Sequence, residues 1–341
     1  MGFLMDLRTY ILRRLLLMVL VLFGVLVITF LLSHVVPADP IGAILGPQAP
    51  LEMVEKIRHE WGFDRPLYEQ FVDYVWRVLH GDLGKSIRTN RAVTRDLMNY
   101  FPATIELATF STFLAIVMGI PLGIISAMKK DKIPDHFARV FAISGISIPV
   151  YWLELVMLIV FYYQLGLLPG PGRLDPYMTY PPRVTGLLLI DSLLAGRLDA
   201  FVNALQHLII PSFVLGMFGA ASIARMTRSS MLEILRKEYV RTAKAKGLRE
   251  RVVIIRHILR NALIPTVTVI GVTYGGLLEG SILTETILAW NGLGQYATGS
   301  FLYLDFMAVM GVTIFIAVIY SLTNLFVDIL YAYLDPRIRY G

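Results

Sequence analysis

The chain has 341 residues, of which 56% are hydrophobic and only 16% charged, and it carries no cysteine and a net charge of +6. Soluble domains carry roughly 25% charged residues, so this composition predicts a chain that largely faces lipid, and the lack of cysteine excludes disulfides, thiolate metal sites and thiol catalysis. The positive charge is compatible with nucleic-acid binding or with membrane topology, and its distribution along the chain distinguishes the two.

Six apolar stretches are long enough, or nearly long enough, to cross a bilayer as helices, which takes about 20 residues. In chain order they are Leu15–Val36, Leu107–Met128, Val140–Leu168, Leu208–Ala224, Ala262–Gly280 and Phe306–Leu330. A cleaved signal peptide is disfavoured for the first stretch, because the apolar part of a signal sequence has only about 7–15 residues and further spans follow. The sequence therefore predicts an all-α polytopic membrane protein with six transmembrane helices.

The fourth stretch is short and runs directly into the polar segment Arg225–Arg228. We therefore expect its helix to continue out of the membrane. Glycine and proline occur inside several spans and are compatible equally with close helix packing and with bends beside a pathway. These residues are Gly119, Pro121, Gly145, Pro149, Pro211, Gly216, Pro265 and Gly271.

Basic residues are concentrated in alternate connecting segments. Segment 225–260 holds eleven Lys or Arg against three Glu, whereas 169–207 balances three Arg with three Asp. Lys and Arg also outnumber acidic residues in 1–14, 129–139 and 335–341, but not in 281–305. Cytoplasmic loops of membrane proteins carry such an excess, so both termini are predicted to be cytoplasmic. Topology thus accounts for the positive charge, and nucleic acid is not expected as a partner.

Three parts follow from this arrangement. Residues 1–36 are predicted to form the cytoplasmic N-terminus and first transmembrane helix, and 37–100 an extracytoplasmic helical segment that is too long for a simple connector. Residues 101–341 form the predicted core with five transmembrane helices and a cytoplasmic loop at 225–260. Two helices are expected in the external segment, at Leu51–Trp61 and Pro66–His80. The second has an apolar stripe of Tyr68, Phe71, Val72, Val75, Trp76 and Leu79.

Gly84-Lys85-Ser86 is similar to the end of a phosphate-binding loop. However, Leu79 occupies the position of the required first glycine, and the preceding residues are predicted to be helical rather than a strand. The six histidines are scattered, and no metal or catalytic-triad spacing is found. The chain is therefore not expected to be an enzyme.

A short amphipathic helix is predicted inside the cytoplasmic loop, from Glu238 to the candidate C-cap Gly247. Two interpretations are open for this helix. It can lie on anionic lipid headgroups, or it can dock to a cytoplasmic partner.

The same helix resembles the EAA loop of ABC importer permeases. Residues 238–248, followed by Arg256–Pro265, are most similar to the oligopeptide/dipeptide branch, although Arg241 and Thr242 stand where the general motif has Glu and Ala. Further matches to that branch cover nearly the whole chain, and the external segment resembles its B-type subunit. They are 13–17, 36–40, 62–68, 81–86, 280–294 and 334–337.

The resemblance implies a type I ABC importer permease fold in the cell membrane and a set of partners. These are a homologous second permease, two cytoplasmic ABC ATPases and an extracytoplasmic substrate-binding protein, together with membrane lipid. ATP and Mg would be bound by the ATPases and no cofactor by this chain. The expected ATPase contacts are Glu238, Tyr239, Arg241, Ala243 and Gly247. The implied substrate is a di- or oligopeptide, with nickel or oligosaccharides as alternatives.

A solitary secondary transporter or channel is the alternative from another class. It would use ionisable residues inside spans, for which Glu154, Glu279 and Asp328 are the candidates. Each lies near a span boundary or Gly-rich sequence, so interfacial or packing roles are expected instead. No inverted repeat is evident, and no paired groups are spaced for an intramembrane hydrolase.

Overall fold

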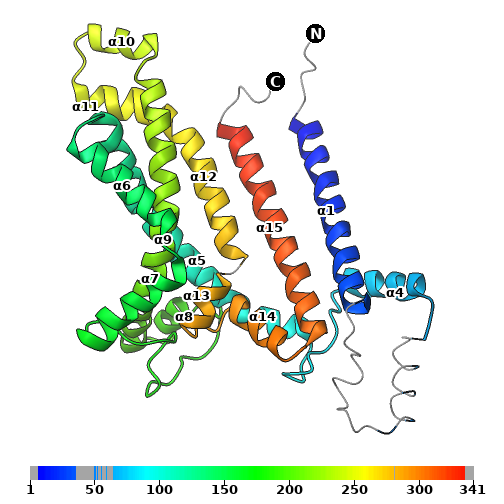
Figure 1. Ribbon diagram of the computed structural model, residues 1–341. Coiled ribbons are helices and arrows are strands. Elements are labelled where there is room, and N and C mark those ends of the chain that lie inside the picture. Colours follow the sequence, from blue (N-terminus) through cyan, green and yellow to red (C-terminus); the bar gives the residue numbers. More distant parts are fainter. Residues whose placement is uncertain are drawn as a thin grey trace.

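The computed structural model describes residues 7–35, 50, 52, 55, 59, 64–279 and 281–334. Over these residues the chain is helical, and the one β-type pairing there is a bridge between Lys85 and Ala92. The all-α prediction is confirmed. The start of α1 (Leu7–Val35), the end of α15 (Phe306–Leu334) and α10 (Glu238–Ala245) lie at the same end of the molecule (Figure 1).

Five of the described helical segments are long and apolar enough to cross a membrane, and there are six if one bent pair is counted as a span. The five lie in α1, α5 (Val93–Met128), α9 (Leu198–Ile234), the run Glu250–Leu278 and α15. That run combines α11 (Glu250–Val252), the π-helix η2 (Val253–Leu259) and α12 (Arg260–Leu278). The fourth predicted span continues well beyond Ala224, as expected from its polar extension.

The third predicted span, Val140–Leu168, is not one continuous helix. It is divided between α6 (Ile133–Ser147), α7 (Val150–Met157) and the π-helix η1 (Leu158–Gln164), and the two halves are bent by 101°. Pro149 causes the break, because its ring disfavours helical backbone at the preceding residue. Ile148 is accordingly extended, with ψ 125°.

α5 and α9 pack along each other more extensively than any other pair of described helices. Glycines permit the close approach: a Cβ at Gly119 would lie 2.8 Å from Ile223 Cβ, and one at Gly123 would lie 2.6 Å from Thr227 Cβ. Gly271 of α12 contacts Val327 of α15 in the same manner. Close helix packing is therefore confirmed at these glycines, and Pro149 breaks a span, whereas a pathway beside that break stays a prediction.

α4 (Leu67–Leu79) lies across the end of α1 that is remote from α10 (Figure 1). The ring of Phe71 meets those of Phe23 and Phe30, with ring centroids 6.1 and 5.2 Å apart, and the Tyr74 hydroxyl is 3.0 Å from that of Thr29. The helix predicted at Pro66–His80 is confirmed. The one predicted at Leu51–Trp61 lies largely outside the described residues. Most of the predicted apolar stripe stays exposed, at Tyr68, Val72, Trp76 and Leu79.

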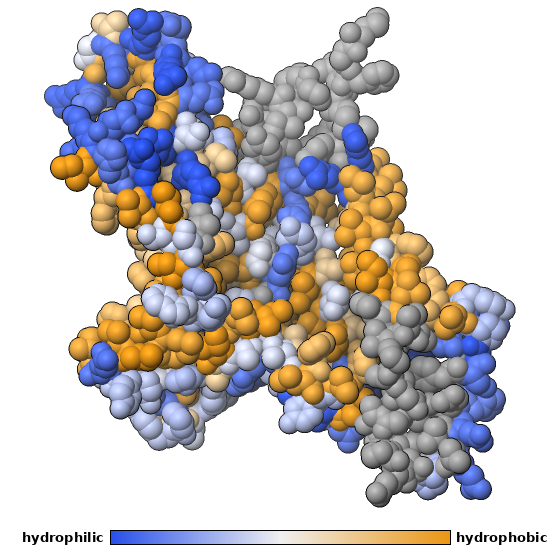
Figure 2. All heavy atoms as spheres, viewed as in Figure 1, coloured by the Kyte–Doolittle hydropathy of each residue, from blue (hydrophilic) through white to orange (hydrophobic). Residues whose placement is uncertain are grey.

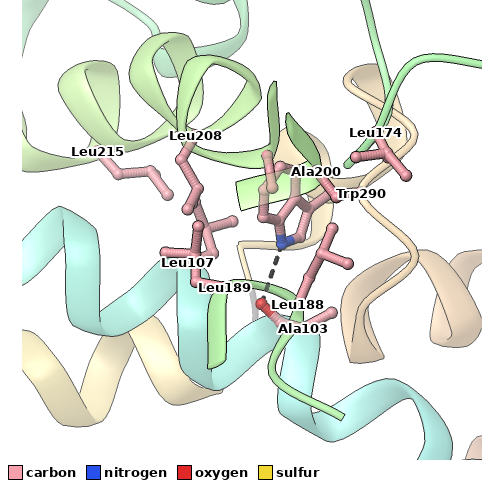
Figure 3. Packing of buried hydrophobic residues seen from close by; sticks show 10 residues of the cluster. Ala103, Leu107, Leu174, Leu188, Leu189, Ala200, Leu208, Leu215 and Trp290 are labelled. Carbon is pink, nitrogen blue, oxygen red and sulfur yellow. Dashed lines mark hydrogen bonds between the residues drawn. The ribbon is translucent and has the colours of Figure 1, made fainter. Parts of the chain in front are cut away.

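The end of the bundle opposite α10 has its own apolar core (Figure 3). Trp290 is its largest side chain, is 1% exposed and donates its indole N–H to the Ala103 carbonyl at 2.9 Å. Three short helices surround it: α8 (Leu188–Leu194), α13 (Ile282–Ile287) and α14 (Leu293–Leu302). The cluster joins the start of α5 to the start of α9, so these helices are fixed to each other at the end opposite α10.

Candidate functional site

The connection between α9 and α12 forms a projecting unit built around α10. Val240 is fully buried and Ala243 is 6% exposed, and both pack into one cluster with residues of α5, α9, η2 and α12. The other members of that cluster are Ala127, Met231, Val253, Ile258 and Ala262. Two apolar residues three positions apart share one face of a helix, so this face fixes α10 to the ends of the spans. The predicted amphipathic helix is confirmed, and the structure ends it at Ala245.

The opposite face of α10 is polar and exposed. The side chains of Glu238 and Arg241 are 82% and 74% exposed and pair with each other at 3.2 Å, while Tyr239 is 43% exposed and accepts a hydrogen bond from Asn261. Hydrophilic side chains gather over α10 and α11 at this end of the molecule (Figure 2). Of the five expected contact residues, Ala243 faces its own chain, whereas Glu238, Tyr239, Arg241 and Gly247 are exposed.

Gly247 ends the α10 unit in the left-handed conformation, with φ +72°. Its amide donates to the Lys244 carbonyl at 3.0 Å, which helps to close the C-terminus of the helix. A Cβ built on Gly247 would meet no atom within 4 Å. The predicted C-cap at Gly247 is therefore confirmed. Within this chain the position favours glycine because of its left-handed backbone, and not because a side chain would collide with a neighbour.

A buried carboxylate ties α6 to the polar extension of α9. Asp135 is fully buried and receives Arg228 Nε and Nη2 at 2.9 and 3.0 Å, the Ser126 hydroxyl at 2.5 Å and the Asp131 amide at 2.9 Å. Arg139 lies 3.4 Å away on the same helix. Sequence reasoning missed this site, because Asp135 and Arg228 are distant in the chain and only the packing of α6 on α9 brings them together.

At the end opposite α10, Glu285 explains the glycines of the 290–294 segment. Its carboxylate accepts hydrogen bonds from the Thr104 hydroxyl at 2.9 Å and from the amides of Gly294 and Gln295 at 2.6 and 3.3 Å. A Cβ at Gly292 would lie 2.4 Å from Glu285 Oε2, so a side chain there would collide with the carboxylate. Burial raises the pKa of Glu285 to about 7, against the opposing effect of these donors.

The three ionisable candidates of the spans are not grouped. Asp328 pairs with Arg14 of α1 at 3.0 Å, and Glu279 lies at the end of α12. Glu154 of α7 is fully buried, and the Thr284 hydroxyl lies near it without the geometry of a hydrogen bond. Among the residues that the structure describes, no group of three or more His, Asp or Glu is placed to hold a metal ion.

Two family descriptions match the chain. Residues 119–340 match the family described as Binding-protein-dependent transport system inner membrane component. Residues 7–108 match the corresponding N-terminal family of the same transport systems. The two matches together extend from the start of α1 past the end of α15.

Curated relatives are similar over almost the full length. The chain is 48% identical over 324 residues to the "Probable D,D-dipeptide transport system permease protein DdpB" of Escherichia coli strain K12, covering 95% of each chain. It is 42% identical to the dipeptide transport system permease protein DppB of Alkalihalophilus pseudofirmus, covering 97% of this chain and 99% of that one. Among solved structures, a chain of the inward-facing MetNI methionine ABC transporter has the same fold. The TM-score is 0.51 at 18% identity, over 70% of this chain and 96% of that chain.

Proposed function

Because the chain belongs to the family of binding-protein-dependent transport system inner membrane components, we propose that it is the permease subunit of an ATP-driven importer of short peptides. The observation that supports the substrate class is the full-length similarity to permeases named for dipeptide or di/tripeptide transport, at 40–48% identity in seven of the relatives. Dipeptides are accordingly the first substrates to test, ahead of longer peptides, nickel or oligosaccharides. A solitary transporter or channel is not favoured.

α10 is the proposed contact with the ATPases. Its exposed face carries Glu238, Tyr239 and Arg241, and its buried face is packed on the ends of the spans. A displacement of α10 would therefore move η2 and α9 with it, rather than bend a loose loop. ATP and Mg would be bound by the ATPases, whose closure need only shift the permease between two states. In this assignment Ala243 packs α10 against the ends of the spans, and Gly247 terminates the helix.

The remaining partners and the orientation follow from the same proposal. A homologous second permease would complete the pathway, and a binding protein would deliver substrate at the end that carries α8, α13 and α14. The end that carries α10, the start of α1 and the end of α15 would face the cytoplasm. The described basic segments 129–139 and 225–260 lie at that end, in keeping with the excess of Lys and Arg in cytoplasmic loops.

Reconstitution tests the proposal. The chain would be assembled in liposomes with the permease, ATPases and binding protein of its own transport system, with ATP on the ATPase side. Uptake of a labelled dipeptide is expected only when ATP and the binding protein are both present, and not with a non-hydrolysable analogue. Equal uptake by the chain alone would instead support a solitary transporter, and ATP-driven uptake of nickel but not dipeptide would refute the substrate class.

A further inference from the structure

A cavity of about 540 Å³ opens between α5, α6 and α9 at the α10 end of the molecule. Its walls are of two kinds. Leu122, Ala142 and Ile143 belong to the apolar part, and Arg139, Arg225 and Arg228 supply positive charge. This cavity is separate from the exposed face of α10 and is not used by the proposed ATPase contact.

The three arginines have different partners. Arg228 and Arg139 share the buried carboxylate of Asp135, with Arg139 also 3.9 Å from the exposed Asp131. Arg225 is exposed to the cavity, and no carboxylate of the described residues lies within ion-pairing distance of it. The cavity therefore keeps a net positive charge that the described part of the chain does not neutralise.

The depth of Arg225 indicates what could neutralise it. Arg228 is level with Ser126 near the end of α5, since both bind Asp135. Arg225 precedes Arg228 by three residues, which places it about 4.5 Å further toward the bilayer centre. An unpaired arginine at this depth is costly unless it reaches water or an anion. The apolar walls beside it suit hydrocarbon better than a small hydrated ion.

We propose that this cavity binds one anionic phospholipid from the leaflet at the α10 end, with the phosphate on Arg225 and an acyl chain along the apolar wall of α6. Basic pockets between membrane helices on the cytoplasmic side bind such headgroups by the same combination of charge and apolar surface. The lipid would contact α5, α6 and α9 together. It would therefore support the helices whose ends carry α10. The site does not depend on the nature of the transported substrate.

Native mass spectrometry of the full chain in detergent tests this site. The chain would be titrated with dioleoylphosphatidylglycerol and, separately, with dioleoylphosphatidylcholine. Phosphatidylcholine has the same phosphate but cancels its charge with choline, so the net negative charge of phosphatidylglycerol near one arginine predicts about fivefold tighter binding of the anionic lipid. Arg225→Gln should abolish this preference, and Arg225→Lys should retain it. Arg236→Gln, which removes the same charge at an exposed position just beyond the end of α9 and outside the cavity lining, is the matched control and should also retain it.

A variant that keeps the charge provides a second test. Ala142→Phe fills the apolar wall and should weaken phosphatidylglycerol binding while leaving all arginines in place; this variant decides the matter if Arg225→Gln does not fold. An unchanged preference in Arg225→Gln would overturn the proposal, as would unchanged binding in Ala142→Phe. Displacement of the lipid by sn-glycerol 1-phosphate would reassign the cavity to a soluble phosphate. Displacement by a dipeptide would reassign it to a carboxylate of the transported substrate.

Discussion

Arg228 on α9 holds Asp135 on α6 through two nitrogens, with Nε 2.9 Å from Oδ1 and Nη2 3.0 Å from Oδ2. Two parallel N–H···O contacts are the strong, directional form of an arginine–carboxylate pair. Because the Asp135 side chain is fully buried and that of Arg228 is 24% exposed, the pair is shielded from water. The pair joins the polar end of α9 to α6, the helix that ends just before Pro149.

Asp135→Asn is expected to lower stability by about 2 kcal/mol or more, because it leaves the partly buried Arg228 without its counter-charge. Thermal unfolding in detergent, followed by circular dichroism, measures the change. Asp131→Asn is the matched control: its side chain is 69% exposed, and asparagine tolerates its φ of +60°. Equal unfolding temperatures for the two variants would contradict a stabilising role for the pair.

Glu285 predicts a pH dependence of stability. Burial raises its pKa from 4.5 to about 7, so the folded protein binds a proton that the unfolded chain releases between these values. This stabilisation is full below pH 4.5 and is lost as the pH rises through about 7. Unfolding temperatures at pH 5 and pH 8 should differ in that direction. The difference should shrink in Glu285→Gln, and a variant as pH-sensitive as the wild type would exclude Glu285 as the cause.

Two variants at Gly247 distinguish a requirement for left-handed backbone from a requirement for close contact with a partner. Gly247→Val is expected to weaken association with the ATPases or to uncouple hydrolysis from uptake, since left-handed backbone costs about 1–2 kcal/mol in a residue with a Cβ. Gly247→Asn adds comparable volume but tolerates this conformation. Co-purification of the ATPases and substrate-stimulated hydrolysis are the measurements. Loss in both variants would indicate steric contact at Gly247, and wild-type behaviour in both would leave α10 as a lipid-surface helix.

Glu154 is predicted to be dispensable for coupling. Glu154→Gln keeps the side-chain volume, and an ATP-driven cycle needs no proton carried on an intramembrane carboxyl, so uptake should stay within about tenfold of wild type. Asp328→Asn, which breaks the pair with Arg14, is tested beside it and carries the same expectation. Uptake that collapses in both variants, with ATPase activity intact, would support an ion-coupled pathway.

Topology can be tested with single cysteines, because the native chain has none. Asp191 of α8 lies at the end opposite α10, but it is buried at 3% exposure and is therefore unsuitable for labelling. Tyr177, which is 82% exposed, replaces it. An impermeant maleimide should label Tyr177→Cys in intact cells and Lys246→Cys only after permeabilisation. The reverse pattern would invert the orientation proposed here.

Much of the fold could be predicted because the signals are local. Apolar length identifies the spans, and the charges at Arg225 and Arg228 correctly indicated that α9 continues past its apolar stretch, to Ile234. Pro149 lies at the break between α6 and α7, yet the prolines at 121, 211 and 265 lie within helices that continue. Whether a proline breaks a helix depends on the neighbours that satisfy the freed backbone groups, and those are tertiary.

The site was less predictable for a related reason. The helix and cap at 238–247 follow from sequence, but the direction of each side chain depends on which face packs. Ala243 is therefore among the expected contact residues, yet its side chain lies on the buried face of α10, against the ends of the spans. The pairing of Asp135 with Arg228, and the cavity beside it, need the register of α6 on α9. Periodicity within either helix does not contain that register.

The length of α9 has a mechanical consequence. Its 37 residues form one uninterrupted helix of about 55 Å, against a hydrocarbon thickness of about 30 Å. The cluster around Trp290 holds the start of α9, at the end opposite α10. Because the helix is long, a tilt of about 5° around that point would displace its other end by about 5 Å. Because its glycine contacts with α5 are close, α9 would tilt together with α5, and a small rotation of the pair could thus produce a stroke of nearly one helical turn at α10.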